Sequence, residues 1–144
     1  MLIKSYSYWR VARGFTLIEL LVVLVILGLL AGIAGPRVMK ALGGAKSDSA
    51  KIQIEEFGAA LDMYHLEVGR YPSSDEGLES LVKAPSNAGK WNGPYLKKNQ
   101  VPPDPWGNPY QYKAPGQHGE FDLYSLGADN AEGGEGDNKD VVNW

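Results

Sequence analysis

The chain has 144 residues, no cysteine and a formal net charge of −3 at pH 7. This length allows one modest domain besides a membrane segment, and without cysteine there is no disulfide, thiolate metal site or cysteine nucleophile. Residues 1–14 carry Lys4, Arg10 and Arg13 and no acid, so the rest of the chain holds 11 basic and 17 acidic residues. An acidic body without a Lys/Arg cluster argues against nucleic acid as a partner.

The first expected element is a membrane-spanning helix over residues 15–35. This apolar run has 21 residues, about the roughly 20 that a helix needs to cross a bilayer core. Its one charge is Glu19. An ionised group on a lipid-facing helix costs roughly 2.5–3.5 kcal/mol, so Glu19 is expected to have a partner. The basic residues before Gly14 favour a cytoplasmic position for the N-terminus.

Three interpretations of this segment differ in where the chain is cut. A plain transmembrane anchor is not cut and leaves the Gly14 junction unexplained. An ordinary secretory signal is cut after the small-x-small pattern Gly32-Ile33-Ala34, so the mature chain would begin at Gly35. A prepilin signal is cut between Gly14 and Phe15 and keeps the apolar helix. The string Gly-Phe-Thr-Leu-Ile-Glu at residues 14–19 resembles the processing site of the type IV pilin and pseudopilin superfamily and favours this third interpretation.

That resemblance implies that a prepilin peptidase cleaves after Gly14 and methylates the new amine of Phe15. The amine is a cation, and Glu19 of a neighbouring subunit can neutralise it within the hydrocarbon. An isolated subunit would then bear the free-energy cost of uncompensated charges in lipid, whereas an assembled subunit would not. The alternative is that Glu19 pairs with the Phe15 amine of its own chain, four residues away.

Pro36 is expected to disturb the helix. A proline in a helix interior cannot donate to the carbonyl four residues earlier, and its ring clashes there. Glycines at positions 28, 32 and 35 weaken the same region. Gly28-x-x-x-Gly32 also matches a helix-packing motif, but a flexible, partly unwound segment is the favoured interpretation. The resemblance implies local melting here when subunits leave the membrane for a fibre.

Residues 36–68 are predicted to form an amphipathic helical stem. Apolar residues recur at alternating spacings of four and three, which defines one helical face to be buried against a small domain: Ala50, Ile54, Phe57, Leu61, Tyr64 and Val68. On the acidic side, Asp62 is predicted to meet Lys97 or Lys98 of an adjacent subunit, a contact of about 0–1 kcal/mol. The alternative is two unrelated solvated faces.

Residues 69–144 are expected to form the globular head. Gly69 ends the stem, and Ser73 and Glu76 form a capping box that opens a short helix. Residues 84–108 read as an ordered irregular loop, and a β-hairpin is expected around the turn-forming residues 115–119. Three aromatic side chains are expected to anchor the loop: Trp91, Tyr95 and Trp106. The two strands of the hairpin show alternating patterns, with Tyr110 and Tyr112 in the first strand and Phe121, Leu123 and Ser125 in the second.

The C-terminal segment combines crowded carboxylates with glycines. Five acids fall between residues 129 and 140: Asp129, Glu132, Glu135, Asp137 and Asp140. Such carboxylates repel one another unless a cation lies among them, and hard oxygen ligands point to calcium. The spacing is not that of an EF-hand. On composition alone, a solvated acidic tail is equally plausible.

Three further motifs carry a resemblance to the major pseudopilins of type II secretion systems. They are Arg70-Tyr71-Pro72 with Glu76-Gly77-Leu78, Asp104-Pro105-Trp106-Gly107-Asn108-Pro109-Tyr110, and Ser125-Leu126-Gly127-Ala128-Asp129. The resemblance implies an α+β pilin-like lollipop, in which a long helix packs on a small antiparallel sheet. It also implies a calcium site in the C-terminal loop. The ligands carried over are the side chains of Asp129, Asp137 and Asp140, with Ser125 and Val141 as backbone donors and Glu132 or Glu135 as substitutes.

The expected function is therefore that of a structural polymer subunit and not an enzyme, because His65 and His118 have no second ligand nearby and no phosphate loop or nucleophile elbow is present. The resemblance implies a homopolymer, a periplasmic pseudopilus that drives folded proteins across the outer membrane. It also implies a single-pass inner-membrane location, with minor pseudopilins, an assembly platform and a cytoplasmic ATPase as partners. The alternatives are a type IV pilin for adhesion or motility and a membrane-anchored calcium-binding module that never polymerises.

Overall fold

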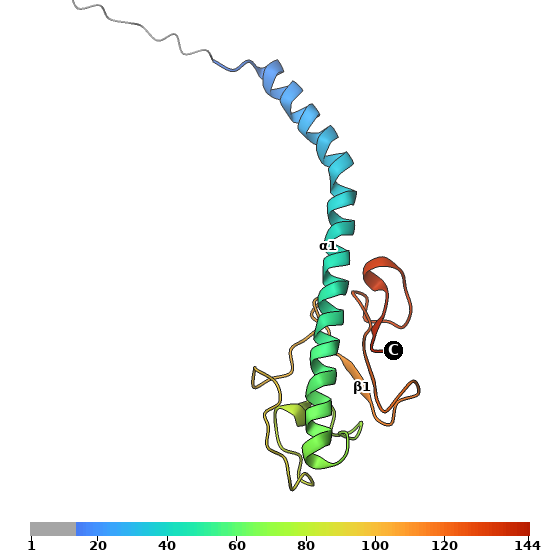
Figure 1. The fold of residues 1–144 in the computed structure, drawn as a ribbon. Coiled ribbons are helices and arrows are strands. Elements are labelled where there is room, and N and C mark those ends of the chain that lie inside the picture. The colour runs from blue at the N-terminus through green and yellow to red at the C-terminus, as the bar shows by residue number, and fades with distance from the viewer. Residues whose placement is uncertain (1–13) are drawn as a thin grey trace, which may run out of the picture. The chain divides into compact units, whose positions relative to one another are not determined.

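The computed structural model describes residues 14–144, so the expected leader peptide lies outside the described residues except for Gly14. One long helix, α1 (Leu17–Val68), is followed by two 3₁₀ turns, η1 (Leu78–Leu81) and η2 (Gly136–Asn138), and three short strands. Figure 1 shows β1 (Gln111–Lys113) beside the C-terminal part of α1. The chain divides into two units, one up to Val38 and the other Met39–Trp144.

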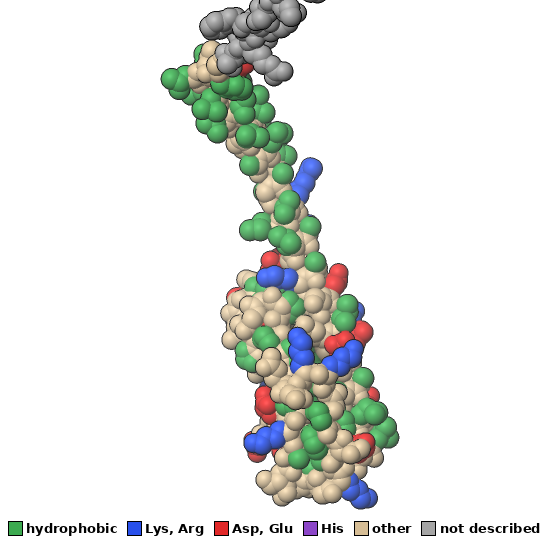
Figure 2. All heavy atoms as spheres, turned by 90° about the vertical axis from the view of Figure 1, so that its left-hand side faces the viewer, with side chains coloured by type: hydrophobic (Ala, Val, Ile, Leu, Met, Phe, Trp, Pro, Cys, Tyr) green, Lys and Arg blue, Asp and Glu red, His purple; other side chains and the backbone are tan. Residues whose placement is uncertain are grey.

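The first unit is the apolar half of α1. Its most apolar stretch of 18 residues has a mean hydropathy of 2.9 and is not buried against any other part of the described chain. This is the one described helix long and apolar enough to cross a membrane. Large apolar side chains therefore lie exposed along the helix, as the green atoms next to the grey segment in Figure 2 show.

The prediction that the helix is partly unwound at Pro36 is wrong. Helix α1 continues through Pro36, which lies in its interior. A proline removes a single backbone donor, and the helical bonds of the residues on either side remain to hold the turn. Melting of this segment inside a fibre stays a prediction.

In the second unit, the predicted apolar face of the stem is confirmed as core. Ala50, Ile54, Phe57, Leu61 and Tyr64 are buried, and Val68 packs against them from a half-buried position. Each large side chain buried in this way contributes about 1.5–3 kcal/mol relative to its exposed state. The head supplies the other side of this core, with Leu78, Leu81, Tyr110 and Leu123.

The head contains a three-stranded antiparallel sheet in the order β1–β2–β3. Strand β1 (Gln111–Lys113) pairs with β2 (Asp122–Ser125), with Tyr112 opposite Leu123, so the predicted hairpin is confirmed. Strand β3 (Val141–Val142) pairs with the end of β2 and was not expected. Two residues are too few to show an alternating pattern, and only the tertiary pairing makes them a strand.

The connections follow the predicted chemistry. Gly69 ends α1 with a φ of 88° and donates its N–H to the carbonyl of His65 at 2.8 Å. The capping box is present, because Glu76 Oε2 accepts from the Ser73 N–H at 2.8 Å and Ser73 Oγ accepts from the Glu76 N–H at 3.3 Å. It opens the expected short helix, which is the 3₁₀ turn η1 and contains Leu78 and Leu81. The region 84–108 is irregular, as expected, and Trp91 donates its indole N–H to the Ser80 carbonyl.

Candidate functional site

The predicted cleavage junction lies just before the first turn of α1. Gly14 and Phe15 are non-helical and exposed, and Phe15 retains 70% of its accessible surface. A peptidase needs an extended, accessible backbone at the bond that it cuts, which a helix does not offer. The exposed, non-helical backbone at Gly14 and Phe15 is therefore compatible with cleavage between these two residues.

Glu19 closes the first turn of its own helix. Its Oε2 lies 3.4 Å from both the backbone N and the Oγ of Thr16, and Thr16 Oγ accepts from the Glu19 N–H at 3.3 Å. These reciprocal bonds form a second capping box. Sequence reasoning missed it, although Thr16 and Glu19 have the same spacing as Ser73 and Glu76. The Glu19 carboxylate thus faces the chain end that cleavage would create.

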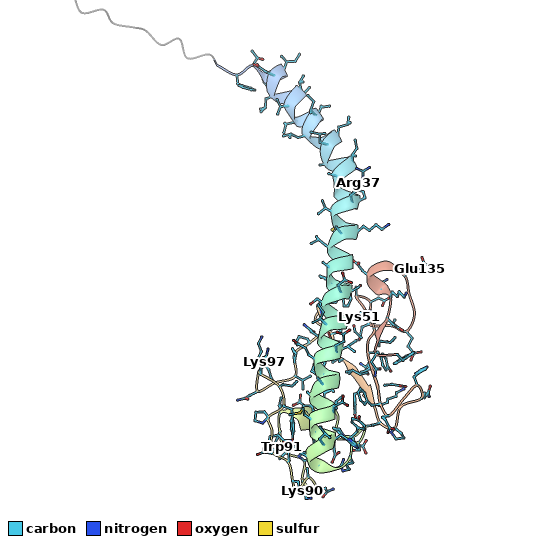
Figure 3. All side chains as sticks on the ribbon, in the orientation of Figure 1. Arg37, Lys51, Lys90, Trp91, Lys97 and Glu135 are labelled. Atoms are coloured by element: carbon cyan, nitrogen blue, oxygen red, sulfur yellow. The ribbon has the colours of Figure 1, made fainter. Side chains whose placement is uncertain are left out.

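Asp62 and Lys98, the predicted inter-subunit pair, have different surroundings. Asp62 is exposed and accepts the Tyr71 hydroxyl at 2.9 Å, and it has no ion pair within the described part of its own chain. Burial, together with this bond to a carboxylate, raises the pKa of Tyr71. Lys97 and Lys98 lie on the rim of a groove floored by Phe57 and Ala60 of α1. Figure 3 shows Lys97 at the tip of the irregular loop.

The three predicted calcium-binding carboxylates occupy one loop between β2 and β3. Asp129 Oδ1 accepts the Ala131 N–H at 3.2 Å, and Asp140 Oδ2 accepts the Gly133 N–H at 2.9 Å. Asp140 Oδ1 is shielded from solvent and has no hydrogen-bond partner among the described residues. The Asp137 side chain lies against Gly43 of α1. Figure 3 shows Glu135, a proposed substitute ligand, at the outer end of this loop.

These carboxylates do not close around a common point. Within residues 14–144, no three side chains among the aspartates, glutamates and histidines gather closely enough to hold a metal ion. The donor set itself suits calcium, because it consists of hard oxygens and includes an unpartnered buried one at Asp140.

The two predicted backbone donors face each other in the sheet. Ser125 and Val141 are register partners in the β2–β3 ladder, at the point where the acidic loop leaves and re-enters it. Ser125 Oγ also donates to Asp104 and accepts from the Gly127 N–H at 3.1 Å. Sequence reasoning missed this link to Asp104, because a contact across 21 positions leaves no local pattern.

The two histidines have packing roles. The ring of His65 stacks on Tyr71 with centroids 4.5 Å apart, and that of His118 stacks on Trp144 at 4.0 Å. His118 Nδ1 also lies 3.2 Å from Asp122 Oδ2. Neither ring stands beside a nucleophile or a set of metal ligands in the described structure, in keeping with the predicted structural roles.

A membrane-length apolar helix, preceded by a Gly-Phe junction and continued into a small sheet domain, defines a pilin-like membrane-anchored subunit. Two protein-family models match the chain: the prokaryotic N-terminal methylation motif over residues 9–35 and type II secretion system protein G over residues 37–144. The chain therefore belongs to the protein G family of type II secretion systems. This assignment favours the major pseudopilin over an enzyme, a type IV pilin or a non-polymerising module.

Individual relatives agree with the family assignment. The chain is 54% identical over 139 residues to type II secretion system core protein G of Pseudomonas aeruginosa, covering 94% of this chain and 96% of that protein. The identity is 46% over 138 residues to core protein G of Vibrio cholerae, covering 94% and 93%. The major pseudopilin of enterohaemorrhagic Escherichia coli has a similar crystal structure, with a TM-score of 0.64, 31% identity and coverage of 76% of this chain and 95% of that one.

Proposed function

We propose that this chain polymerises into a periplasmic pseudopilus whose growth drives folded proteins across the outer membrane. The observation that carries the proposal is the exposed apolar half of α1, which nothing in residues 14–144 covers. In the inner membrane, lipid covers this surface and the helix spans the bilayer once, with the head in the periplasm. In a fibre, the same surface is covered by the helices of other copies.

Processing converts the anchor into an assembly element. Prepilin peptidase would cut after Gly14 and methylate Phe15, leaving a cationic chain end next to the turn that Glu19 closes. The carboxylate already faces this position through its bonds to Thr16. Pairing between the amine of one subunit and Glu19 of the next removes two uncompensated charges from the hydrocarbon, which favours the assembled state.

The test separates the charge of Glu19 from its role in helix capping. Glu19→Gln retains an oxygen that can accept from Thr16 but has no charge, whereas Thr16→Ala loses the cap and keeps the carboxylate. We expect Glu19→Gln to be cleaved and methylated normally, as mass spectrometry of the mature N-terminus reports, but to lower fibre yield at least about tenfold, since each unpaired charge in lipid costs roughly 2.5–3.5 kcal/mol. Thr16→Ala should assemble nearly normally. Normal fibre yield from Glu19→Gln would refute the pairing.

Contacts between heads would add to the helical core. Asp62 is exposed on the stem, and Lys98 lies exposed on the groove rim, so both are available to an adjacent subunit. One such pair contributes about 0–1 kcal/mol, but a helical array repeats it. Reversing both charges together should restore the fibre yield lost on reversing either one. A double reversal that rescues neither single change would count against the contact.

We also propose that calcium binds the C-terminal loop through Asp129, Asp137 and Asp140. The hard-oxygen donor set and the unpartnered Asp140 Oδ1 support this. Backbone oxygens of Ser125 and Val141 would complete the site, with Glu132 or Glu135 as substitutes. The ion would neutralise the crowded carboxylates and close the terminal loop of a small head that has no disulfide.

Other proteins of the secretion system would be needed for fibre growth. Since the sequence contains no phosphate-binding loop, the energy for growth would come from a cytoplasmic ATPase acting through an inner-membrane assembly platform. Minor pseudopilins would be further protein partners. These partners are proposed from the family. The chain itself would be a self-associating subunit that supplies no energy.

A further inference from the structure

The stem carries a second apolar face, on the side of α1 turned away from the head. Ile52 and Leu66 retain 58% and 77% of their accessible surface there. They belong to a row of four exposed residues at intervals of seven: Ala45, Ile52, Ala59 and Leu66. Seven residues make almost two full turns, so this apolar row runs nearly straight along the helix. It lies well beyond Gly35, where the membrane-length apolar run ends, so lipid does not account for it.

A row of carboxylates runs beside the apolar row. Asp48, Glu55 and Asp62 are exposed and are also spaced by seven residues. Each stands three residues after a member of the apolar row, and residues three apart on a helix are neighbours. None of the three forms an ion pair within residues 14–144. Lys51 is the only lysine or arginine between residues 48 and 66, so this outer face of the stem is net negative.

The irregular loop of the head has the opposite charge. Residues 80–103 contain no acid and four lysines, all of them exposed: Lys83, Lys90, Lys97 and Lys98. None of these lysines forms an ion pair within the described part of the chain. Close to the tip that Lys97 marks in Figure 3, Pro94 is exposed and Leu96 is half-buried. The loop therefore offers cations and apolar atoms together, which complements the two rows on the stem.

We propose that the outer face of the stem, defined by the apolar row and the carboxylate row, binds the loop 80–103 of a second copy of this chain. The inference rests on the polymer proposed above and makes the pair of Asp62 and Lys98 one point of a larger contact. Two identical stem faces would bring their carboxylate rows together, and like charges opposed across an interface disfavour association. A second copy therefore meets this face with a different surface, its lysine-bearing loop.

This choice of surfaces determines the kind of assembly. A contact between two different patches of the same chain leaves one stem face and one loop free at the two ends of any row of copies, so it can continue as an open helical array. The apolar row supplies most of the attraction, because exposed ion pairs contribute little in water whereas apolar surface contributes in proportion to the area covered. Leu66, the most exposed large side chain of the row, is the expected anchor.

Leu66→Ser and Leu66→Met test the apolar row in the full-length chain, in cells that assemble the fibre. Methionine keeps an apolar side chain of similar size, whereas serine does not. Because Leu66 is 77% exposed in a single copy, both variants should keep the wild-type melting temperature. We expect Leu66→Ser to lower fibre yield at least about fivefold, through loss of one buried leucine from every contact, and Leu66→Met to assemble nearly normally. Normal fibre yield from Leu66→Ser would overturn the inference.

Cross-linking between two differently tagged copies tests which surfaces meet. One copy carries Leu66→Cys and the other Asn99→Cys, at an exposed position next to Lys98. The chain has no cysteine of its own, so oxidation of mixed fibres should give a mixed dimer, and neither copy alone should give a dimer. Lys113→Cys, exposed on β1 outside the loop, replaces Asn99→Cys in the control and should give no product. A dimer of Leu66→Cys alone would show that two stem faces meet and would overturn the inference.

A cysteine in the apolar half of α1 separates failure of this contact from failure of the polymer. Leu24→Cys should give a ladder of cross-linked species wherever the chain polymerises. A ladder from Leu24→Cys without a mixed dimer from Leu66→Cys and Asn99→Cys would refute the proposed surface and leave the polymer standing. Absence of the ladder would refute the polymer itself, and the contact with it.

Discussion

The Ser125 hydroxyl donates to Asp104 Oδ2 in the interior of the head, where the two residues are 0% and 3% exposed. Asp104 Oδ1 accepts the backbone N–H groups of Trp106 and Asn108 at 3.0 and 2.8 Å. The Asn108 side-chain amide in turn donates to the Gly127 carbonyl at 2.8 Å. One buried carboxylate therefore organises its own turn and ties it to the start of the acidic loop.

Asp104→Ala should be among the most destabilising single changes in the head. It leaves the buried Ser125 hydroxyl and the half-buried N–H groups of Trp106 and Asn108 without their acceptor. Each such loss costs about 1–3 kcal/mol, so a total of about 3 kcal/mol is expected. Ser125→Ala removes one donor to this carboxylate and also the acceptor of the Gly127 N–H, so it should cost less, about 2 kcal/mol. Chemical unfolding of the two variants measures both values. Equal effects would contradict the central place given to Asp104.

Acid should weaken the link between Arg70 and Glu76. Two hydrogen bonds from the Arg70 guanidinium, at 2.6 and 2.7 Å, hold the pKa of Glu76 at about 2, below its ordinary value of 4.5. Because the folded pKa is the lower one, the stabilisation is fully present above pH 4.5 and is lost as the pH falls toward 2. Arg70 is 40% exposed, so solvent screening limits the effect to about 1 kcal/mol.

Unfolding measured at pH 6 and at pH 3 in the wild type and in Glu76→Gln checks this. The variant should be less stable at pH 6, and the difference should shrink at pH 3. Glu79→Gln is the control, since Glu79 is exposed and forms no ion pair within residues 14–144. An unchanged difference between wild type and Glu76→Gln at the two pH values would show that the ion pair does not carry the effect.

Two glycines of the stem should respond in opposite directions to alanine. Gly69 has a φ of 88°, where a side chain is strained, so Gly69→Ala should destabilise by about 1 kcal/mol although nothing lies within 4 Å of the new methyl group. Gly58 lies within α1 with equally open surroundings, so Gly58→Ala should stabilise by about 1 kcal/mol. Thermal unfolding of both variants tests this, and changes of the same sign would contradict it.

Chelation should lower the melting temperature if calcium binds the terminal loop. An ion at 100 times its dissociation constant stabilises the folded state by about 2.7 kcal/mol, which the chelator removes. Asp129→Asn should be less sensitive to the chelator, while Glu120→Gln, an exposed change outside the loop, should respond as the wild type does. A wild-type melting temperature that is the same with and without chelator would dispose of the site.

Much of this fold follows from periodicity and turn chemistry in the sequence. The stripe from Ala50 to Tyr64 is buried because its spacing matches a helical face, and Gly69 ends α1 because only glycine readily adopts the backbone conformation required there. The short strand β3 left no such pattern. A proline in a helix interior usually interrupts the helix, but α1 continues through Pro36. The hydrogen bonds of the surrounding turns hold the helix despite one missing donor.

The candidate site was less accessible to sequence reasoning. The composition of the acidic loop pointed to hard-oxygen chemistry, but not to the way in which Asp137 rests on Gly43, 94 positions earlier, because that contact depends on the tertiary fold. The contact between Ser125 and Asp104 could not be predicted from the sequence for the same reason. The Thr16–Glu19 capping box is different, since these two residues have the same three-residue spacing as Ser73 and Glu76, which is a local pattern in the sequence.

A polymer of this chain requires self-association through the apolar half of α1, and cross-linking in the membrane tests this directly. The chain has no cysteine, so cysteines introduced at Leu24 and Ile26, about 200° apart around the helix, supply the only thiols on two opposite faces. Oxidation in cells that assemble the secretion system should give a ladder of dimers, trimers and higher species, and Glu19→Gln should shorten it. A product that stops at monomer or dimer would contradict the polymer.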